Sequence, residues 1–161
     1  MKQKLNNLVY VVASLGLVGL VPAARVWGSL LGIVLWWVFS WVQTMMPMAG
    51  FVGMLVTLTI LAGISWYVRR DIPEEREADI VLDRIAGVAL ALAWLPSVTA
   101  KFLLFGFCFF HMWLFISILA QRVYVYDNKT ATGSVTLSTG EILLIALLTN
   151  TALRLLWWIA H

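Results

Sequence analysis

Residues 98–120 read VTAKFLLFGFCFFHMWLFISILA, a run of 23 residues with one charged side chain, Lys101. A helix needs roughly 20 consecutive, mostly apolar residues to cross the hydrocarbon core of a bilayer. The run therefore predicts a membrane-spanning helix. The whole chain agrees: its 161 residues are 62% hydrophobic and 12% charged, with a mean hydropathy of +0.93. This composition excludes soluble globular, disordered, collagen-like and other fibrous proteins.

Four further segments predict spans, at residues 28–46, 49–68, 80–95 and 141–160. Another apolar segment, residues 8–24, is shorter than most of these and is interrupted by two glycines and a proline. We expect an all-α, polytopic membrane helical bundle: a single domain over residues 1–161 with about five transmembrane helices. Residues 1–25 are expected to form a re-entrant or interfacial segment. They begin like a signal peptide but lack a small-residue cleavage site, so we expect them to be retained.

The positions of the charged residues predict how this bundle is oriented in the membrane. If residues 8–24 return to the side on which they start, nine of the eleven Lys and Arg residues lie on one side of the membrane, leaving Lys101 and Arg154. Lys and Arg gather in cytoplasmic loops. All eight carboxylates lie in or beside the two loops on that side, around residues 69–79 and 121–140. We therefore expect any functional site at the cytoplasmic surface of the membrane.

The strongest candidate site is the start of the segment 80–95. Asp79 and Asp83 are four residues apart and lie on one face of a helix. Ionisable residues just inside a span are costly and indicate function. With Glu141, at the start of the last span, they would form an all-oxygen site of the kind that Mg²⁺ uses. The alternative is a solvated helix end whose acids and arginines neutralise one another.

Arginine is well suited to bind phosphate, because its guanidinium group matches phosphate oxygens in bidentate fashion. Arg25 and Arg84 stand alone beside apolar segments and are the candidate phosphate ligands. Arg69 and Arg70 are better explained by the cytoplasmic excess of basic residues and by attraction to anionic lipid.

Several other residues have structural explanations. His111, within the run quoted above, is expected to form a hydrogen bond between helices. Gly28 and Gly32 show the spacing that lets two membrane helices approach closely. Ser138 and Glu141 have the spacing of a capping box. Arg154 either reaches the outer surface or pairs with a polar group inside the bundle. No nucleophile elbow, phosphate-binding loop or His–Cys metal motif occurs, and no nucleic-acid partner is expected.

The stretch Ile80-Val81-Leu82-Asp83-Arg84-Ile85-Ala86-Gly87 resembles the phosphatidylglycerophosphatase A family, whose corresponding motif is Ile-Val-x-Asp-Glu-x-x-Gly. The similarity extends to Gly28-Ser29-Leu30, to two spans before an acidic loop, and to a last helix that starts with an acid. The resemblance implies a bacterial inner-membrane, Mg²⁺-dependent enzyme that removes the terminal phosphate of phosphatidylglycerophosphate. It also implies that Asp83 and Glu141 are the catalytic and metal-binding acids.

Several family positions differ in this chain. The Glu of the central motif is Arg84, and the acidic pair of the last helix is Gly140-Glu141. The family's Arg, Asp, Lys and Pro are absent from residues 110–118. An arginine beside a metal site adds repulsion to the cation but can still hold a phosphate.

Two functions follow from these features. The first is a lipid-phosphate phosphatase homologue, which is either an active enzyme or one whose activity is weakened or lost. The alternative is a non-catalytic membrane subunit or anionic-lipid-binding protein, with a protein partner or a second copy of the chain. A transporter is a more distant third, because few polar groups lie within the spans.

Overall fold

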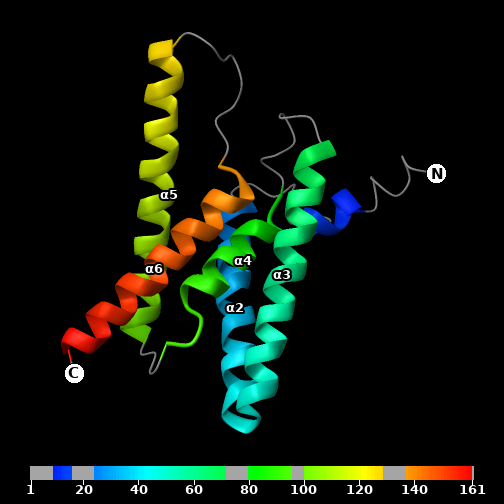
Figure 1. Ribbon diagram of the computed structural model, residues 1–161, viewed down its shortest axis with the longest axis vertical. Coiled ribbons are helices and arrows are strands. Elements are labelled where there is room, and N and C mark those ends of the chain that lie inside the picture. Colours follow the sequence, from blue (N-terminus) through cyan, green and yellow to red (C-terminus); the bar gives the residue numbers. More distant parts are fainter. Residues whose placement is uncertain (1–8, 16–23, 72–79, 96–99, 129–136, 161) are drawn as a thin grey trace.

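The computed structural model describes residues 9–15, 24–71, 80–95, 100–128 and 137–160. These residues form helices without strands, and a short helical turn at residues 9–13 precedes five helices. The helices are α2 (Ala24–Met45), α3 (Pro47–Asp71), α4 (Leu82–Ala91), α5 (Ala100–Asn128) and α6 (Thr139–Ala160), arranged around α4 (Figure 1). The expected all-α class is confirmed.

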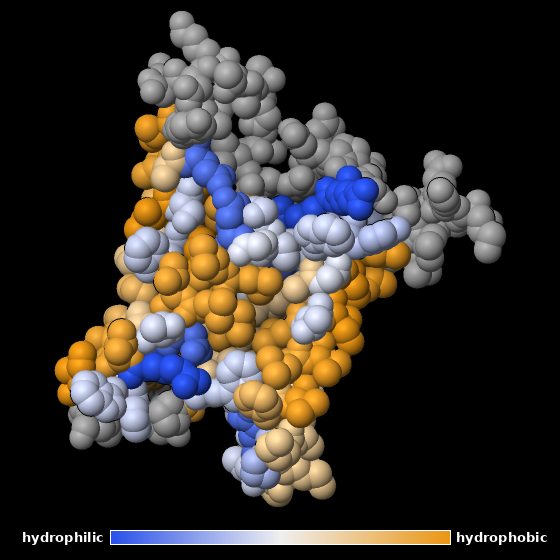
Figure 2. All heavy atoms as spheres, in the orientation of Figure 1, coloured by the Kyte–Doolittle hydropathy of each residue, from blue (hydrophilic) through white to orange (hydrophobic). Residues whose placement is uncertain are grey.

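Four of these helices, α2, α3, α5 and α6, are long and apolar enough to cross a membrane. Large apolar side chains, among them Trp37, Ile60, Leu104 and Trp158, are exposed on their outer faces. Figure 2 shows apolar atoms over the middle of the molecule, with hydrophilic atoms gathered above them and at the lower left. Soluble proteins rarely expose so large an apolar surface to water, and this bundle is therefore a membrane protein.

The segment 80–95 differs from the expected span. Its helix, α4, has ten residues and is about 15 Å long, half of what a bilayer core requires. Nine of those ten residues are buried, including Asp83 and Arg84. A short apolar run has the same composition whether it faces lipid or lies inside a bundle, so the sequence pattern does not distinguish the two. Here the other helices enclose it.

Glycines allow the close packing around α4. A Cβ atom added to Gly28 of α2 would lie 2.2 Å from Val81 Cγ1, and one added to Gly32 would lie 2.8 Å from the Ile85 carbonyl oxygen. On the other side, Gly87 of α4 leaves room for the Phe110 ring. The close approach predicted from the spacing of Gly28 and Gly32 is thus confirmed.

Two side chains of α6 satisfy the C-terminal end of α4. The last carbonyl groups of a helix have no partner within it. Asn150 Nδ2 lies 3.0 Å from the Ala91 oxygen and 2.8 Å from the Ala93 oxygen, and Arg154 donates to the Trp94 oxygen at 2.9 Å. A cation at this end also complements the helix dipole. Of the two roles expected for Arg154, the structure shows pairing within the bundle.

The N-terminal segment packs at the opposite end of α4. The Val81 amide donates to the Ala13 oxygen at 3.1 Å, and Ala13 and Ala24 belong to one apolar cluster with Val68 and Ile80. Ala13 and Ala24 therefore pack against the same apolar cluster at the start of α4. Residues 16–23 lie outside the described residues, so the re-entrant or interfacial segment stays a prediction.

Candidate functional site at the start of helix α4

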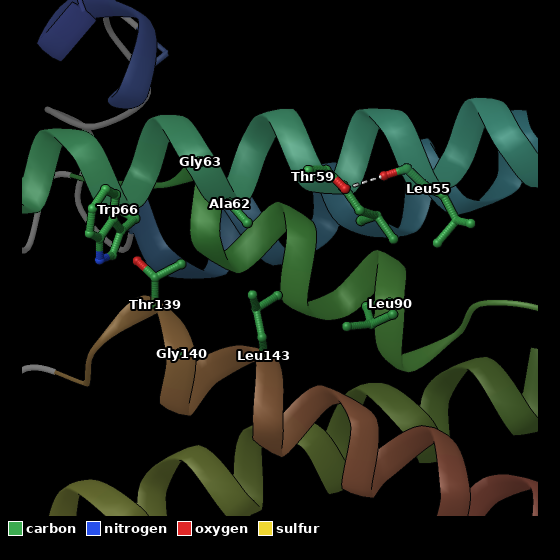
Figure 3. Close-up of a pocket in the computed structure, with 10 residues that line it drawn as sticks. Leu55, Thr59, Ala62, Gly63, Trp66, Leu90, Thr139, Gly140 and Leu143 are labelled. Atoms are coloured by element: carbon green, nitrogen blue, oxygen red, sulfur yellow. Dashed lines mark hydrogen bonds between the residues drawn. The ribbon is translucent and has the colours of Figure 1, made fainter.

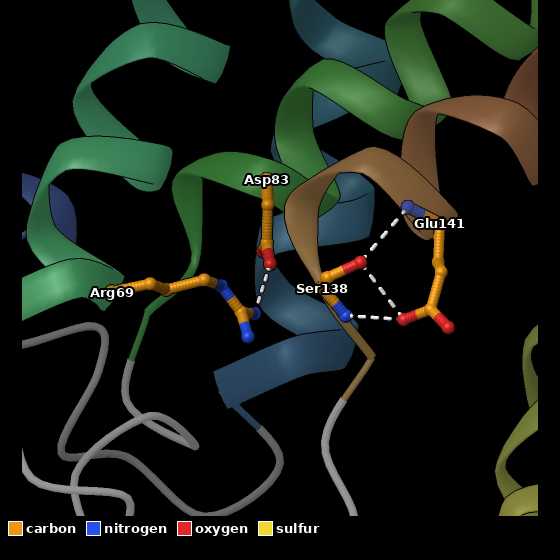
Figure 4. A network of polar contacts seen from close by, with 4 residues as sticks. All are labelled: Arg69, Asp83, Ser138 and Glu141. Atoms are coloured by element: carbon orange, nitrogen blue, oxygen red, sulfur yellow. Dashed lines mark hydrogen bonds and ion pairs between the residues drawn. The ribbon is translucent and has the colours of Figure 1, made fainter.

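Charged residues meet where α3 ends and α4 begins. Arg69 lies in the last turn of α3 and Asp83 in the first turn of α4, positions where the helix dipoles favour a cation and an anion respectively. Arg69 Nη2 donates to Asp83 Oδ2 at 2.5 Å, and the two side chains are 13% and 0% exposed (Figure 4). Arg69, explained above by membrane topology alone, is thus the ion-pair partner of the buried acid.

The Asp83 carboxylate can accept more hydrogen bonds than the one that it receives from Arg69. Its second oxygen, Oδ1, is buried and has no hydrogen-bond partner in the described part of the chain. The hydroxyls of Ser65 on α3 and Thr139 on α6 are in the same condition. Buried polar atoms without partners are uncommon in folded proteins and call for a reason, such as a ligand or a water. The helices α3, α4 and α6 therefore each carry a buried side-chain oxygen that has no hydrogen-bond partner among the described residues.

Arg84 follows Asp83 and is also buried, at 5% exposure. Its Cβ lies 3.4 Å from the position that a Cβ on Gly28 would take, so it sits against α2. Asp83, Arg69 and Arg84 together carry two positive charges and one negative charge. The junction of α3 and α4 therefore carries two guanidinium groups, which are of the kind that binds phosphate.

The Glu141 side chain caps the N-terminal end of α6. Its Oε2 accepts bonds from the Ser138 amide at 2.6 Å and the Ser138 hydroxyl at 2.9 Å, while the Glu141 amide donates to Ser138 Oγ at 3.2 Å. Gln121 of α5 donates to Oε1 at 2.8 Å. This confirms the predicted capping box. In Figure 4, Glu141 turns toward Ser138, whereas Asp83 turns toward Arg69.

His111 joins α5 to α2. Its Nδ1 lies 2.8 Å from the Phe107 carbonyl oxygen and its Nε2 lies 3.0 Å from Ser29 Oγ. Since a carbonyl only accepts, Nδ1 carries a proton, and in the neutral ring Nε2 accepts from the Ser29 hydroxyl. The expected link between helices is confirmed. Its partner, which was not foreseen, lies within the Gly-Ser-Leu motif.

The sequence matches the model of the phosphatidylglycerophosphatase A family over residues 11–122. The chain belongs to the phosphatidylglycerophosphatase A family. No curated protein and no solved structure matches it. The family match covers Ser29, Arg69, Asp83, Arg84 and His111, and it ends before α6. Membership supports a membrane lipid phosphatase, and it places the buried pair inside the part of the chain that carries the family's sequence.

The magnesium site implied by the family is not assembled by the residues that the structure describes. No group of three or more His, Cys, Asp or Glu side chains suited to a metal ion occurs among them. Asp83 is held by Arg69, and Glu141 is held by Ser138 and Gln121. Of the other predicted residues, Asp79 lies outside the described residues. Arg25 lies in α2, but its side chain is likewise outside them. The binding of Mg²⁺ therefore stays a prediction.

Proposed function

We propose that the protein binds phosphatidylglycerophosphate at the junction of α3 and α4, through the terminal phosphate of the lipid, and does so without efficient hydrolysis. The observation that carries this proposal is the buried ion pair between Arg69 and Asp83, with Arg84 beside it. The site keeps two guanidinium groups, which bind phosphate, and no group of three acids or other ligands suited to a metal occurs among the residues that the structure describes.

Asp83 acts in this proposal as an internal anion. A buried arginine without a counter-ion is costly, so Asp83 holds Arg69 in place when no lipid is bound. A phosphate group offers more acceptor oxygens than a carboxylate and binds two arginines at once. The lipid phosphate is therefore expected to accept hydrogen bonds from Arg69 alongside Asp83, and Arg84 donates the second contact to the phosphate.

Hydrolysis of the same lipid is the second candidate. It is favoured by the unpartnered Oδ1 of Asp83, since a free carboxylate oxygen is available to orient a water or a metal. It is opposed by Arg84, which stands where the family carries Glu, and by the capping bonds of Glu141. The two candidates share the binding step and differ in turnover.

The orientation proposed for the site is cytoplasmic, in a bacterial inner membrane. Arg69 and Arg70 end α3, Arg84 begins α4, and Arg122 lies near the end of α5. The C-terminal ends of α3 and α5 and the N-terminal end of α4 point toward one end of the bundle (Figure 1). Basic residues concentrate on the cytoplasmic side.

The test compares two lipids that differ only in the terminal phosphate. Purified protein in detergent is titrated with phosphatidylglycerophosphate and with phosphatidylglycerol of the same acyl chains, and phosphate release is measured with Mg²⁺ and with a chelator. We expect tighter binding of the phosphorylated lipid and no release above background. Equal affinities would contradict the binding proposal. Release that requires Mg²⁺ and is abolished by Asp83→Asn would establish the phosphatase instead.

A further inference from the structure

An apolar groove of about 540 Å³ runs between α3 and α6, with α4 as its floor (Figure 3). This volume falls within the range of small-molecule sites. Its walls are almost entirely apolar, and the residues that line it include Leu55, Gly63 and Trp66 of α3, Leu90 of α4, and Thr139 and Gly140 of α6.

The groove exists because two of its positions lack side chains. A Cβ atom added to Gly63 or to Gly140 would meet no heavy atom within 4 Å. Both positions therefore face open space, in contrast to Gly28 and Gly32, which pack against α4. The glycines of this chain thus serve two purposes, and those at 63 and 140 leave a groove on the surface that faces lipid.

One end of the groove lies one helical turn from Arg69 along α3. Trp66 and Thr139 face each other across it (Figure 3), and Arg69 follows Trp66 by three residues, one helical turn along α3. The Thr139 side chain is 4% exposed, lines the groove, and has no partner for its hydroxyl among the described residues. The groove is thus apolar along most of its length and has the Thr139 hydroxyl at the end from which α3 continues to Arg69.

The length of the groove suits one leaflet of a bilayer. Along α3 it runs from Leu55 to Trp66, which is about 16 Å at the rise of an α-helix. Half of a hydrocarbon core is about 15 Å. An apolar groove of this length, one helical turn from the guanidinium group of Arg69, matches an anionic lipid, in which an apolar tail is joined to a charged phosphate.

We infer that this groove holds an acyl chain of the phospholipid whose phosphate binds near Arg69 and Arg84. The inference rests on the proposed function and deepens it, since it makes the protein selective for acyl-chain length as well as for the headgroup. The Thr139 hydroxyl, at the polar end, would donate to the ester region of the lipid.

The test fills the groove with Gly63→Leu and measures binding of long-chain and short-chain phosphatidylglycerophosphate. Loss of contact with only two methylene groups lowers affinity about tenfold. We expect Gly63→Leu to weaken binding of the long-chain lipid by at least about that factor and to leave the short-chain lipid unchanged. Gly63→Ala should have an intermediate effect and guards against misfolding of the larger variant.

Val56→Leu is the matched control, because Val56 is exposed on α3 and does not line the groove. It should leave both affinities unchanged. Unaltered long-chain binding by Gly63→Leu would overturn the inference, and so would an equal loss for both lipids. A change of oligomeric state without a change of lipid affinity would also overturn it, since the groove would then hold a helix of a second copy.

A different set of results would contradict the proposed phosphate site. If replacement of Arg69 or Arg84 by Gln leaves affinity unchanged while Gly63→Leu lowers it, the groove binds lipid but the phosphate site is wrong. If the Arg variants lower the affinity and Gly63→Leu does not, the phosphate site is supported and the groove does not hold the acyl chain.

Discussion

Arg69 of α3 and Asp83 of α4 form an ion pair in which the carboxylate is completely buried. The pair joins the helix before the acidic loop to the helix after it, and so fixes the end of α4 at which the phosphate is proposed to bind. It also places a guanidinium group against Asp83, the acid that the sequence predicts to bind a metal ion.

Breaking this pair from one side should destabilise the protein strongly. Asp83→Asn leaves Arg69 without its counter-ion, and removal of one partner of a buried pair costs about 3 kcal/mol or more. The double variant Arg69→Met, Asp83→Leu should recover much of this loss, because it removes both charges. Unfolding in mixed detergent micelles measures these free energies. Arg70→Met, at the next and exposed position, is the control, and a double variant no more stable than Asp83→Asn would contradict the account.

The C-terminal end of α4 should depend on Asn150. Asn150→Leu removes the amide that serves the Ala91 and Ala93 carbonyls, and a buried carbonyl without a partner costs about 1–3 kcal/mol. We expect a loss of that size in the free energy of unfolding. Thr151→Ala, whose hydroxyl bonds only within α6, should change it little. Equal effects of the two substitutions would show that the Asn150 contacts contribute nothing.

The same substitution should have opposite effects at two glycines. Gly32→Ala forces a methyl group to within 2.8 Å of the Ile85 carbonyl oxygen and should cost about 1–3 kcal/mol by pushing α2 from α4. Gly63→Ala meets open space and should gain up to about 1 kcal/mol from helix propensity. Thermal unfolding of the two variants compares the signs directly. Shifts in the same direction would refute the packing described for α2 and α4.

Glu141 should behave as a capping residue. Ser138→Ala removes the N-cap and should cost about 1 kcal/mol of stability, and Glu141→Gln should cost less because the amide oxygen can still accept. Neither change should alter the affinity for phosphatidylglycerophosphate. If Glu141→Gln weakened lipid binding or phosphate release while Ser138→Ala did not, Glu141 would belong to the site.

The sequence predicts the four long helices well because each is a separate apolar run of sufficient length. It does not predict that the segment 80–95 forms only a short, enclosed helix. That outcome depends on Gly28, Gly32 and Asn150, which lie on other helices and bring them against α4. A local pattern carries no information about such neighbours.

For the site, Asp83 is evident from the sequence as a charge at the start of an apolar run. Its partner is not, since the pairing of Arg69 with Asp83 spans fourteen residues and an intervening loop. Glu141 shows a further limit, because one spacing suits both a capping box and a ligand. Only the bonds to Ser138 and Gln121 decide between them.

The most direct test of the account is the affinity ratio between phosphatidylglycerophosphate and phosphatidylglycerol, measured for the wild type, Arg84→Gln and Arg70→Gln. A hydrogen bond from a charged donor is worth about 1.5–3 kcal/mol, or at least about tenfold in affinity. We predict that the wild type and Arg70→Gln prefer the phosphorylated lipid by that factor and that Arg84→Gln loses the preference. A wild type without preference, or an Arg84→Gln variant that keeps it, would contradict a phosphate site at the start of α4.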